Sequence, residues 1–156
     1  MSANVLVDTN ILVYAYDRST PEKQSRALQV LDALVSSGAG ALTTQVLAEF
    51  YVAVTRKIPA PLNAADAYER VHNLQRAWTV LPVTPLVVLE AARGVRDHQM
   101  SYWDAQVWAA ARLNQIPTVC SEDLAGAPTI EGVSFVNPFS PGFRVEEWVG
   151  RQRAFA

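Results

Sequence analysis

Short apolar segments alternate with helix-patterned segments along most of this chain, and that alternation narrows the folds it can adopt. The first apolar segment, Val5–Val7, lies within residues 4–8 and is followed at once by Asp8. Because it does not alternate polar with apolar residues, it is predicted to be a strand buried on both faces, as in parallel sheets. Further short strands are predicted at residues 39–43, 79–82, 117–120 and 133–136.

Helices are predicted between these strands. Thr20 and Pro21 suit the N-cap and the first position of a helix, and Gly38 is typical of a helix end. Thr9 or Asn10 is expected to cap the first helix. Helices are expected at residues 11–16, 21–37, 45–57, 63–77, 85–97 and 101–115. The alternation predicts an α/β fold, with a parallel-rich sheet of about five short strands flanked by helices.

Length and composition fit one domain with a substantial core. The chain has 156 residues, of which 50% are hydrophobic, and a formal net charge of -2. That charge argues against a broad DNA-coating surface, and a single cysteine, Cys120, excludes an internal disulfide framework. No apolar run reaches the roughly 18 residues of a membrane span, and residues 1–10 lack secretory-signal features, so a cytoplasmic location is expected. Residues 1–139 are expected to form the domain and residues 140–156 a tail of separate character.

Four acidic residues lack the pairing with a basic helix neighbour that accounts for many other acids in the chain. Asp8 follows the first predicted strand, and Asp123 follows the fourth. Glu49 has no basic residue three or four positions away, and Asp104 lies on an otherwise apolar helix. Each has an ordinary explanation when taken singly. Asp8 suits a helix N-cap, Asp123 a turn and Glu49 a solvent-facing helix edge, whereas Asp104 forms a capping-box pattern with Ser101.

Taken together, these four acids indicate a binding site. The carboxyl ends of parallel strands share one edge of a sheet, where ligands of α/β folds bind. Asp8 and Asp123 therefore belong at the same edge, and the fold allows Glu49 and Asp104 to join them. Two carboxylates about 4 Å apart repel by about 4 kcal/mol at an effective dielectric near 20. Protons or a divalent cation must offset that repulsion, and all-oxygen sites suit Mg²⁺ or Mn²⁺.

Five short motifs occur in order along the chain. They are VLVDTNIL, LAEFY, SYWDA, SEDL and GVSFVNPF, at residues 5–12, 47–51, 101–105, 121–124 and 132–139. Each motif is weak by itself. As an ordered set covering about residues 3–139, they resemble the PIN domain, and specifically the VapC-like toxin ribonucleases of type II toxin–antitoxin systems.

The resemblance implies a three-layer α/β/α fold, with residues 1–139 as the nuclease domain and an acidic site. The family's acids fall on Asp8, Glu49, Asp104 and Asp123. The implied reaction is metal-assisted hydrolysis of RNA phosphodiester bonds, with Mg²⁺ or Mn²⁺ as the cofactor. Asp8 is then the central ligand, and Asp104 and Glu49 hold or orient the metal and its waters. Asp123 binds a second ion or tunes the first.

The resemblance also implies accessory residues and partners. The polar residue near the first acid is Thr9 or Asn10, and Ser121 assists near the fourth acid. Three basic residues that follow helices carrying site residues are predicted to form a rim for RNA: Arg18, Arg56 and Lys57. Members of the family usually form homodimers and are held inactive by a small antitoxin. A homodimer, a cognate VapB-like antitoxin and no membrane association are therefore expected.

Other interpretations stay open. A haloacid-dehalogenase-type phosphatase requires a second acid at the position of Asn10 and a late lysine, whereas this chain has only Lys23 and Lys57. A receiver domain lacks support for similar reasons. A PIN nuclease in RNA processing and a PIN-like binding module without activity are the remaining alternatives. Trp103 and Trp108 are expected to pack rather than to stack on bases.

Overall fold

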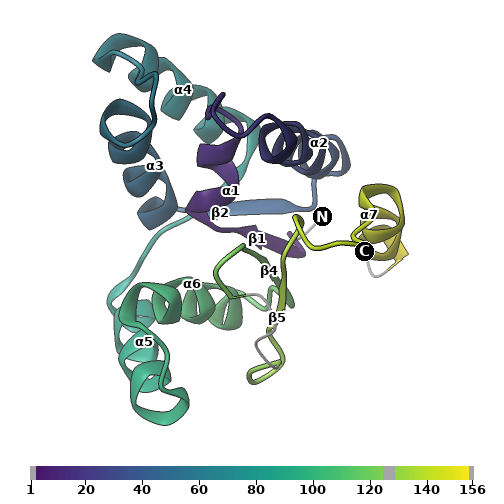
Figure 1. Cartoon of the computed structure of the whole chain (residues 1–156). Helices are drawn as coiled ribbons and strands as arrows, with labels where there is room; N and C mark the ends of the chain where they lie inside the picture. Colours follow the sequence, from purple (N-terminus) through teal and green to yellow (C-terminus); the bar gives the residue numbers. More distant parts are fainter. Residues whose placement is uncertain (1–2, 125–128, 155–156) are drawn as a thin grey trace.

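The computed structural model describes residues 3–124 and 129–154, and in them the chain forms one five-stranded parallel sheet. The strand order is β3-β2-β1-β4-β5, with every neighbouring pair parallel (Figure 1). The strands are β1 (Val5–Val7), β2 (Gly40–Thr43), β3 (Thr79–Leu81), β4 (Thr118–Cys120) and β5 (Ser134–Val136). The predicted parallel α/β sheet is confirmed, and each strand lies within or nearly within its predicted range.

The apolar sequence of β1 is explained by its place at the centre of the sheet. Leu6 pairs with Ala41 of β2 on one side and with Val119 of β4 on the other. Successive side chains of a strand point to opposite faces, so Val5 and Val7 enter one core cluster and Leu6 enters the other. Because all three side chains are fully buried, neither face of the strand has room for a polar residue.

Helices cover both faces of the sheet, which confirms the three-layer arrangement. They are α1 (Thr9–Tyr14), α2 (Pro21–Ser37), α3 (Thr44–Arg56), α4 (Ala64–Ala77), α5 (Pro85–His98), α6 (Tyr102–Leu113) and α7 (Val145–Ala154). Helices α5 and α6 pack on one face, whereas α1 to α4 and α7 lie on the other side of the strands (Figure 1). Thr43, Asn63 and Thr84 cap α3, α4 and α5 through their side-chain oxygens.

Two helix starts differ from their predictions. The first helix begins at Thr9, and neither Thr9 nor Asn10 is its cap. Its N-cap is Asp8, whose carboxylate accepts the Thr9 N–H, which confirms the ordinary explanation of that acid. At the start of α6, Ser101 makes no side-chain hydrogen bond to the backbone. Its hydroxyl donates instead to Asp104 Oδ2 at 2.8 Å. The predicted capping box is therefore wrong, because the serine hydroxyl is used to hold the carboxylate.

The tail after β5 folds back onto the domain. Trp148 and Val149 of α7 are 3% and 7% exposed and join the core cluster that α2 also lines. The Arg26 guanidinium of α2 donates to the carbonyls of Pro138 and Phe143, at 2.8 and 3.2 Å. The tail thus contributes to the core beside α2. Among the described residues, no helix has the length and apolar character needed to cross a membrane.

The strand order also fixes where a cleft can form. From the central strand β1, the chain builds outward to β2 and β3 on one side, and later to β4 and β5 on the other. The segments leaving β1 and β4 therefore diverge from neighbouring carboxyl ends. Such a switch in direction opens a crevice at that edge, where ligands of α/β sheets bind.

Candidate active site

The floor of the crevice is formed by the residues that directly follow β1 and β4. The Asp8 N–H donates to the Cys120 carbonyl at 2.9 Å, and the Ser121 N–H donates to the Val136 carbonyl at 2.9 Å. These bonds continue the sheet pairing by one residue beyond each strand. Asp8 is 7% exposed and Ser121 is fully buried. The backbone of the sheet therefore holds both side chains at the base of the cleft.

Asp8 is the most buried acid of the site. Its carboxylate accepts the Ser121 hydroxyl at Oδ2 and the Thr9 N–H at Oδ1, both at 2.8 Å. Burial raises the pKa of Asp8 to about 6, although these two hydrogen bonds act in the opposite direction. The nearby charges of Asp104 and Glu49 contribute smaller increases that are included in this value. The ionised form of Asp8 is thus costly unless positive charge arrives beside it.

Glu49 reaches the same cleft from α3. Its Oε2 accepts the Thr9 hydroxyl at 3.1 Å, and its Oε1 accepts the Gln45 side-chain amide at 2.6 Å. Gln45 lies one helical turn before Glu49, so their side chains share one face of α3. The prediction that Glu49 lies at an exposed helix edge is confirmed, and that edge borders the cleft.

Asp104 and Asp123 are also held by uncharged donors. Ser101 Oγ donates to Asp104, as described above. Asn10 Nδ2 donates to Asp123 Oδ2 at 3.1 Å, and the Asp123 N–H donates to Ser121 Oγ at 3.2 Å. The same serine therefore contacts both Asp8 and the loop that carries Asp123.

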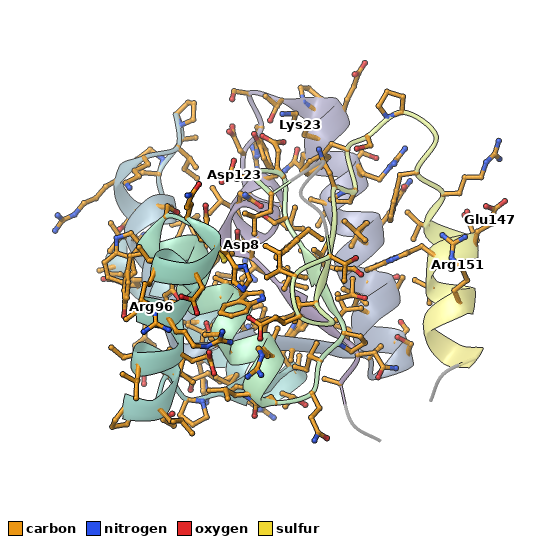
Figure 2. The ribbon with its side chains drawn as sticks, turned by 90° about the horizontal axis from the view of Figure 1, so that it is seen from below. Asp8, Lys23, Arg96, Asp123, Glu147 and Arg151 are labelled. Carbon is orange, nitrogen blue, oxygen red and sulfur yellow. The ribbon has the colours of Figure 1, made fainter. Side chains whose placement is uncertain are left out.

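One cleft of about 410 Å³ gathers these groups, which we call the acidic cleft. Its walls include all four predicted acids, Asp8, Glu49, Asp104 and Asp123, together with Thr9 and Asn10. Figure 2 shows Asp8 and Asp123 on the same side of the strands, with Asp8 deeper in the molecule. Residues separated by more than a hundred positions in sequence are thus brought to one opening.

The donor chemistry of the acidic cleft fits a hard divalent cation. Among the described residues, no group of three His, Cys, Asp or Glu side chains forms a ready metal cage. Mg²⁺ does not require one, because it usually keeps several waters and binds through one or two carboxylates. All four acids supply only oxygen ligands, and besides burial the charges of Asp104 and Glu49 raise the pKa of Asp8. The residues present therefore fit Mg²⁺ or Mn²⁺.

The basic residues are distributed differently from the acids. Lys57 lines the acidic cleft and is exposed. Arg18 and Arg56 are also exposed, but neither is among the residues that line this cleft. Of the predicted rim, the structure brings only Lys57 to the opening.

Sequence reasoning missed a basic residue at the edge of the cleft. Lys23 Nζ contacts Glu122 Oε2 at 2.8 Å, and Tyr14 donates its hydroxyl to Glu122 Oε1 at 3.0 Å. Figure 2 shows Lys23 on the same side of the molecule as Asp123. Lys23 and Glu122 are 99 positions apart in sequence, so no local spacing pattern predicts their contact.

Gln45 and Trp103 also line the acidic cleft and were not predicted as site residues. The spacing of Gln45 to Glu49, four residues apart on one helix, was the available signal for the first. The position of Trp103 directly before Asp104 was the signal for the second. The expectation that Trp103 packs in the core is wrong, because its side chain is 63% exposed, whereas Trp108 is fully buried as expected.

Several solved structures share this fold. A toxin–antitoxin complex from Klebsiella pneumoniae superposes with a TM-score of 0.63 and 18% identity, covering 88% of this chain and 99% of that chain. FitAcB from Neisseria gonorrhoeae gives a TM-score of 0.61 and 20% identity, covering 86% of this chain and 98% of that one. VapC20 of Mycobacterium tuberculosis, a sarcin–ricin loop cleaving toxin, gives a TM-score of 0.61 and 18% identity, covering 81% of this chain and 97% of that one.

Sequence comparison identifies the family. No curated protein matches the sequence of this chain. The family model described as the PIN domain matches residues 5–125. The match runs from β1 to the segment after β4. It therefore includes every acid that lines the acidic cleft. Because the matched segment covers well over half of the chain, this protein belongs to the PIN domain family.

Proposed function

We propose that this protein is a toxin-type endoribonuclease that hydrolyses RNA phosphodiester bonds with Mg²⁺ or Mn²⁺ at the acidic cleft. One observation carries the proposal. Six carboxylates line one cleft of a PIN domain, and no ion pair joins the four predicted ones, Asp8, Glu49, Asp104 and Asp123, to a basic side chain among the described residues. The neighbours in fold, which include a toxin that cleaves the sarcin–ricin loop, support RNA as the substrate.

In this proposal each carboxylate has a task set by its contacts. Asp8 is the central ligand, held in one orientation by Ser121 and by the Thr9 N–H. Glu49 and Asp104 hold the cation or its waters, and Asp123 either binds a second ion or tunes the first. A divalent cation held by these carboxylates would polarise the scissile phosphoryl group and would lower the pKa of a bound water for attack.

The uncharged donors of the cleft keep the site negative. Thr9 and Gln45 orient Glu49 without neutralising it, and Asn10 does the same for Asp123. An arginine in their place would occupy the carboxylates with a permanent cation. Lys57 lines the opening of the cleft, which supports a contact between its ammonium and a phosphate of the bound strand.

The proposal includes two protein partners. The neighbours from Klebsiella pneumoniae and Salmonella typhimurium are, respectively, a toxin–antitoxin complex and a DNA-bound VapBC complex, which supports inhibition by a cognate VapB-like antitoxin. A homodimer is also proposed. It is supported by exposed apolar side chains along α5, where Leu86 and Leu89 are 61% and 68% exposed, because contiguous apolar surface marks interfaces.

The test is cleavage of a defined RNA panel with and without Mg²⁺ or Mn²⁺. Wild-type protein is compared with Asp8→Asn, which keeps the side-chain shape and removes the charge. Asp97→Asn is the matched control, because Asp97 is a carboxylate of α5 paired with arginines and outside the cleft. We expect metal-dependent cutting by wild type and by Asp97→Asn, and a loss of at least about 100-fold in Asp8→Asn.

The outcomes separate this proposal from the alternatives. Undiminished cutting by folded Asp8→Asn would remove Asp8 from the site. Binding of RNA by wild type without any cutting would favour a binding module without activity. Metal-dependent cutting confined to the processing of a precursor RNA would favour a PIN nuclease outside toxin–antitoxin systems.

A further inference from the structure

Trp103 differs from the other three tryptophans of the chain. Trp78, Trp108 and Trp148 are 8%, 0% and 3% exposed, whereas Trp103 is 63% exposed. An indole is the largest apolar side chain, and leaving it in water gives up the stabilisation that burial provides. Trp103 lies in the first turn of α6, directly before Asp104. Its exposure therefore places a large aromatic surface beside the acidic cleft.

The surroundings of Trp103 hold it in place. Its ring meets the Tyr102 ring edge to face, with centroids 5.0 Å apart and an interplanar angle of 78°. The Tyr102 hydroxyl donates to Gln106 Oε1 at 2.8 Å, and Gln106 Nε2 donates to Gln45 Oε1 at 2.9 Å. Gln45 is the residue that also donates to Glu49. A chain of hydrogen bonds thus links the aromatic pair to a carboxylate of the site.

Trp103 stands between two hollows of the surface. One is the acidic cleft, and the other is a larger, mainly apolar groove of about 680 Å³ whose walls include Ala48, Val52 and Val83. Trp103 and Lys57 line both hollows. The groove is therefore continuous with the cleft, and an aromatic ring and a cation lie at their junction.

This arrangement suits a nucleotide of a single strand. A nucleotide carries an aromatic face and an anionic phosphate, and here Trp103 offers a ring and Lys57 a positive charge on the walls of the same two hollows. Proteins that hold single strands combine basic grooves with aromatic side chains on which bases stack. Bases within a duplex are already stacked, so such a platform selects unpaired positions.

On the basis of the proposed ribonuclease function, we propose that Trp103 is a stacking platform for an unpaired nucleobase next to the scissile phosphate. The base lies on the indole at the mouth of the apolar groove, and Lys57 contacts the adjoining phosphate. Trp103 thus selects RNA whose bases are splayed out, as in loops, while the carboxylates perform the cleavage. The continuity of groove and cleft favours the RNA over a protein segment as the occupant.

Steady-state kinetics on an RNA that wild type cleaves provide the first test. Trp103→Ala is expected to raise KM by roughly tenfold or more, with a much smaller change in kcat, because the stacking surface is lost. Trp103→Phe is expected to retain most of the affinity, and Trp103→Leu, which is apolar without a π face, is expected to behave like Trp103→Ala. Tyr68→Ala is the matched control, since Tyr68 is 72% exposed on α4 and lines neither hollow.

Fluorescence supplies a second readout that does not depend on cleavage. Single-stranded RNA oligonucleotides are titrated into Asp8→Asn protein, which is expected to leave them intact. Stacking is expected to quench the exposed indole, and the quench is expected to disappear in the Asp8→Asn/Trp103→Phe protein. A fully paired RNA duplex is expected to quench much less.

The outcomes distinguish this proposal from the proposed function. If wild type cleaves RNA but Trp103→Ala keeps the wild-type KM and no quench occurs, the stacking proposal is overturned and the ribonuclease function stands. If Trp103→Leu matches Trp103→Phe, the groove is an apolar docking surface, which suits a protein segment and contradicts stacking. If wild type neither cleaves nor binds any RNA, both proposals fall. Because Trp103 is exposed, its variants are expected to melt near the wild-type temperature.

Discussion

Carboxylates gather in two regions of this protein, and their partners differ. In the acidic cleft, hydroxyl, amide and backbone N–H groups hold the four predicted acids. In the charged network beside α5 and α6, Glu90, Asp97 and Glu131 are paired with Arg93 and Arg112. Arg96, which pairs with Asp97 in this network, lies apart from Asp8 in Figure 2.

Two carboxyl groups, Asp8 from the cleft and Glu131 from the network, have pKa values shifted in opposite directions. Burial raises the pKa of Asp8 to about 6, whereas the His98 and Arg93 hydrogen bonds lower the pKa of Glu131. A paired carboxylate is already neutralised, but a carboxylate held by neutral donors keeps its charge for a ligand. The burial of an acid and the charge of its partners together therefore separate a structural role from a site role.

The largest expected effect is on the pH dependence of stability in metal-free protein. The pKa of Asp8 is about 6 in the folded protein, whereas its ordinary value in an unfolded chain is 3.8. Between these two values, the folded protein keeps a proton on Asp8 that the unfolded chain has released. The contribution of Asp8 to the free energy of unfolding is therefore fully present below about pH 4 and is lost as the pH rises through 6. Above that range, the free energy of unfolding of Asp8→Asn is expected to exceed that of wild type by up to about 3 kcal/mol.

Urea denaturation of both proteins between about pH 4 and pH 8 measures this difference. Asp97→Asn is the control, because the pKa of Asp97 is lowered and its removal must not produce the same gain. A wild type that is as stable as Asp8→Asn at pH 8 would mean that Asp8 is not strained in the folded protein.

The next effect concerns the cation. Mg²⁺ or Mn²⁺ at about one hundred times its dissociation constant is expected to stabilise wild type by about 2.7 kcal/mol. The same addition is expected to do little for Asp8→Asn, because the central carboxylate is gone. Thermal melting with titrated metal measures both. Equal stabilisation of the two proteins would place the cation elsewhere, and Glu131→Gln, in the charged network, is expected to respond like wild type.

A smaller effect is expected from the hydroxyl that orients Asp8. Ser121→Ala removes the 2.8 Å hydrogen bond to Asp8 Oδ2 and the contact with the Asp123 N–H. Loss of such an orienting partner typically lowers metal affinity by about 10- to 100-fold. Calorimetric titration with Mn²⁺ measures the affinity. Ser121→Cys keeps a weak donor, so its Mn²⁺ affinity is expected to lie between those of wild type and Ser121→Ala. An unchanged affinity in Ser121→Ala would show that the neutral donors do not prepare the site.

The smallest effect is expected in the charged network. Glu131→Gln weakens pairs with Arg93, Arg112 and His98 whose side chains are about one-third exposed, and such pairs contribute little. Because the pKa of Glu131 is lowered, its contribution is present above its ordinary pKa and is lost as pH falls. A decrease in melting temperature of no more than about 4 °C is expected at pH 7. A larger decrease in melting temperature would mean that the ion pairs of this network contribute more to stability than partly exposed pairs usually do.

The sequence by itself predicted the order of elements from β1 to β5 and four of the acids that line the cleft, Asp8, Glu49, Asp104 and Asp123. Val5–Val7 is apolar throughout and Thr20-Pro21 begins a helix, so periodicity and helix signals located the strands and helices close to their observed bounds. Asp8 and Asp123 follow strands that prove to be neighbours. Parallel strands present their carboxyl ends at one edge, so this part of the site followed from local patterns and one rule of topology.

Only the tertiary structure decided which groups hold those acids and which aromatic ring stays in water. Ser121 meets Asp8 across 113 positions and Thr9 meets Glu49 across 40. Trp103 and Trp108 lie on one helix, yet one is exposed and the other fully buried. Local spacing fixes which face of a helix a residue occupies, but not what packs against that face. Partners and exposure depend on contacts between segments far apart in sequence, and those contacts form only when the layers assemble.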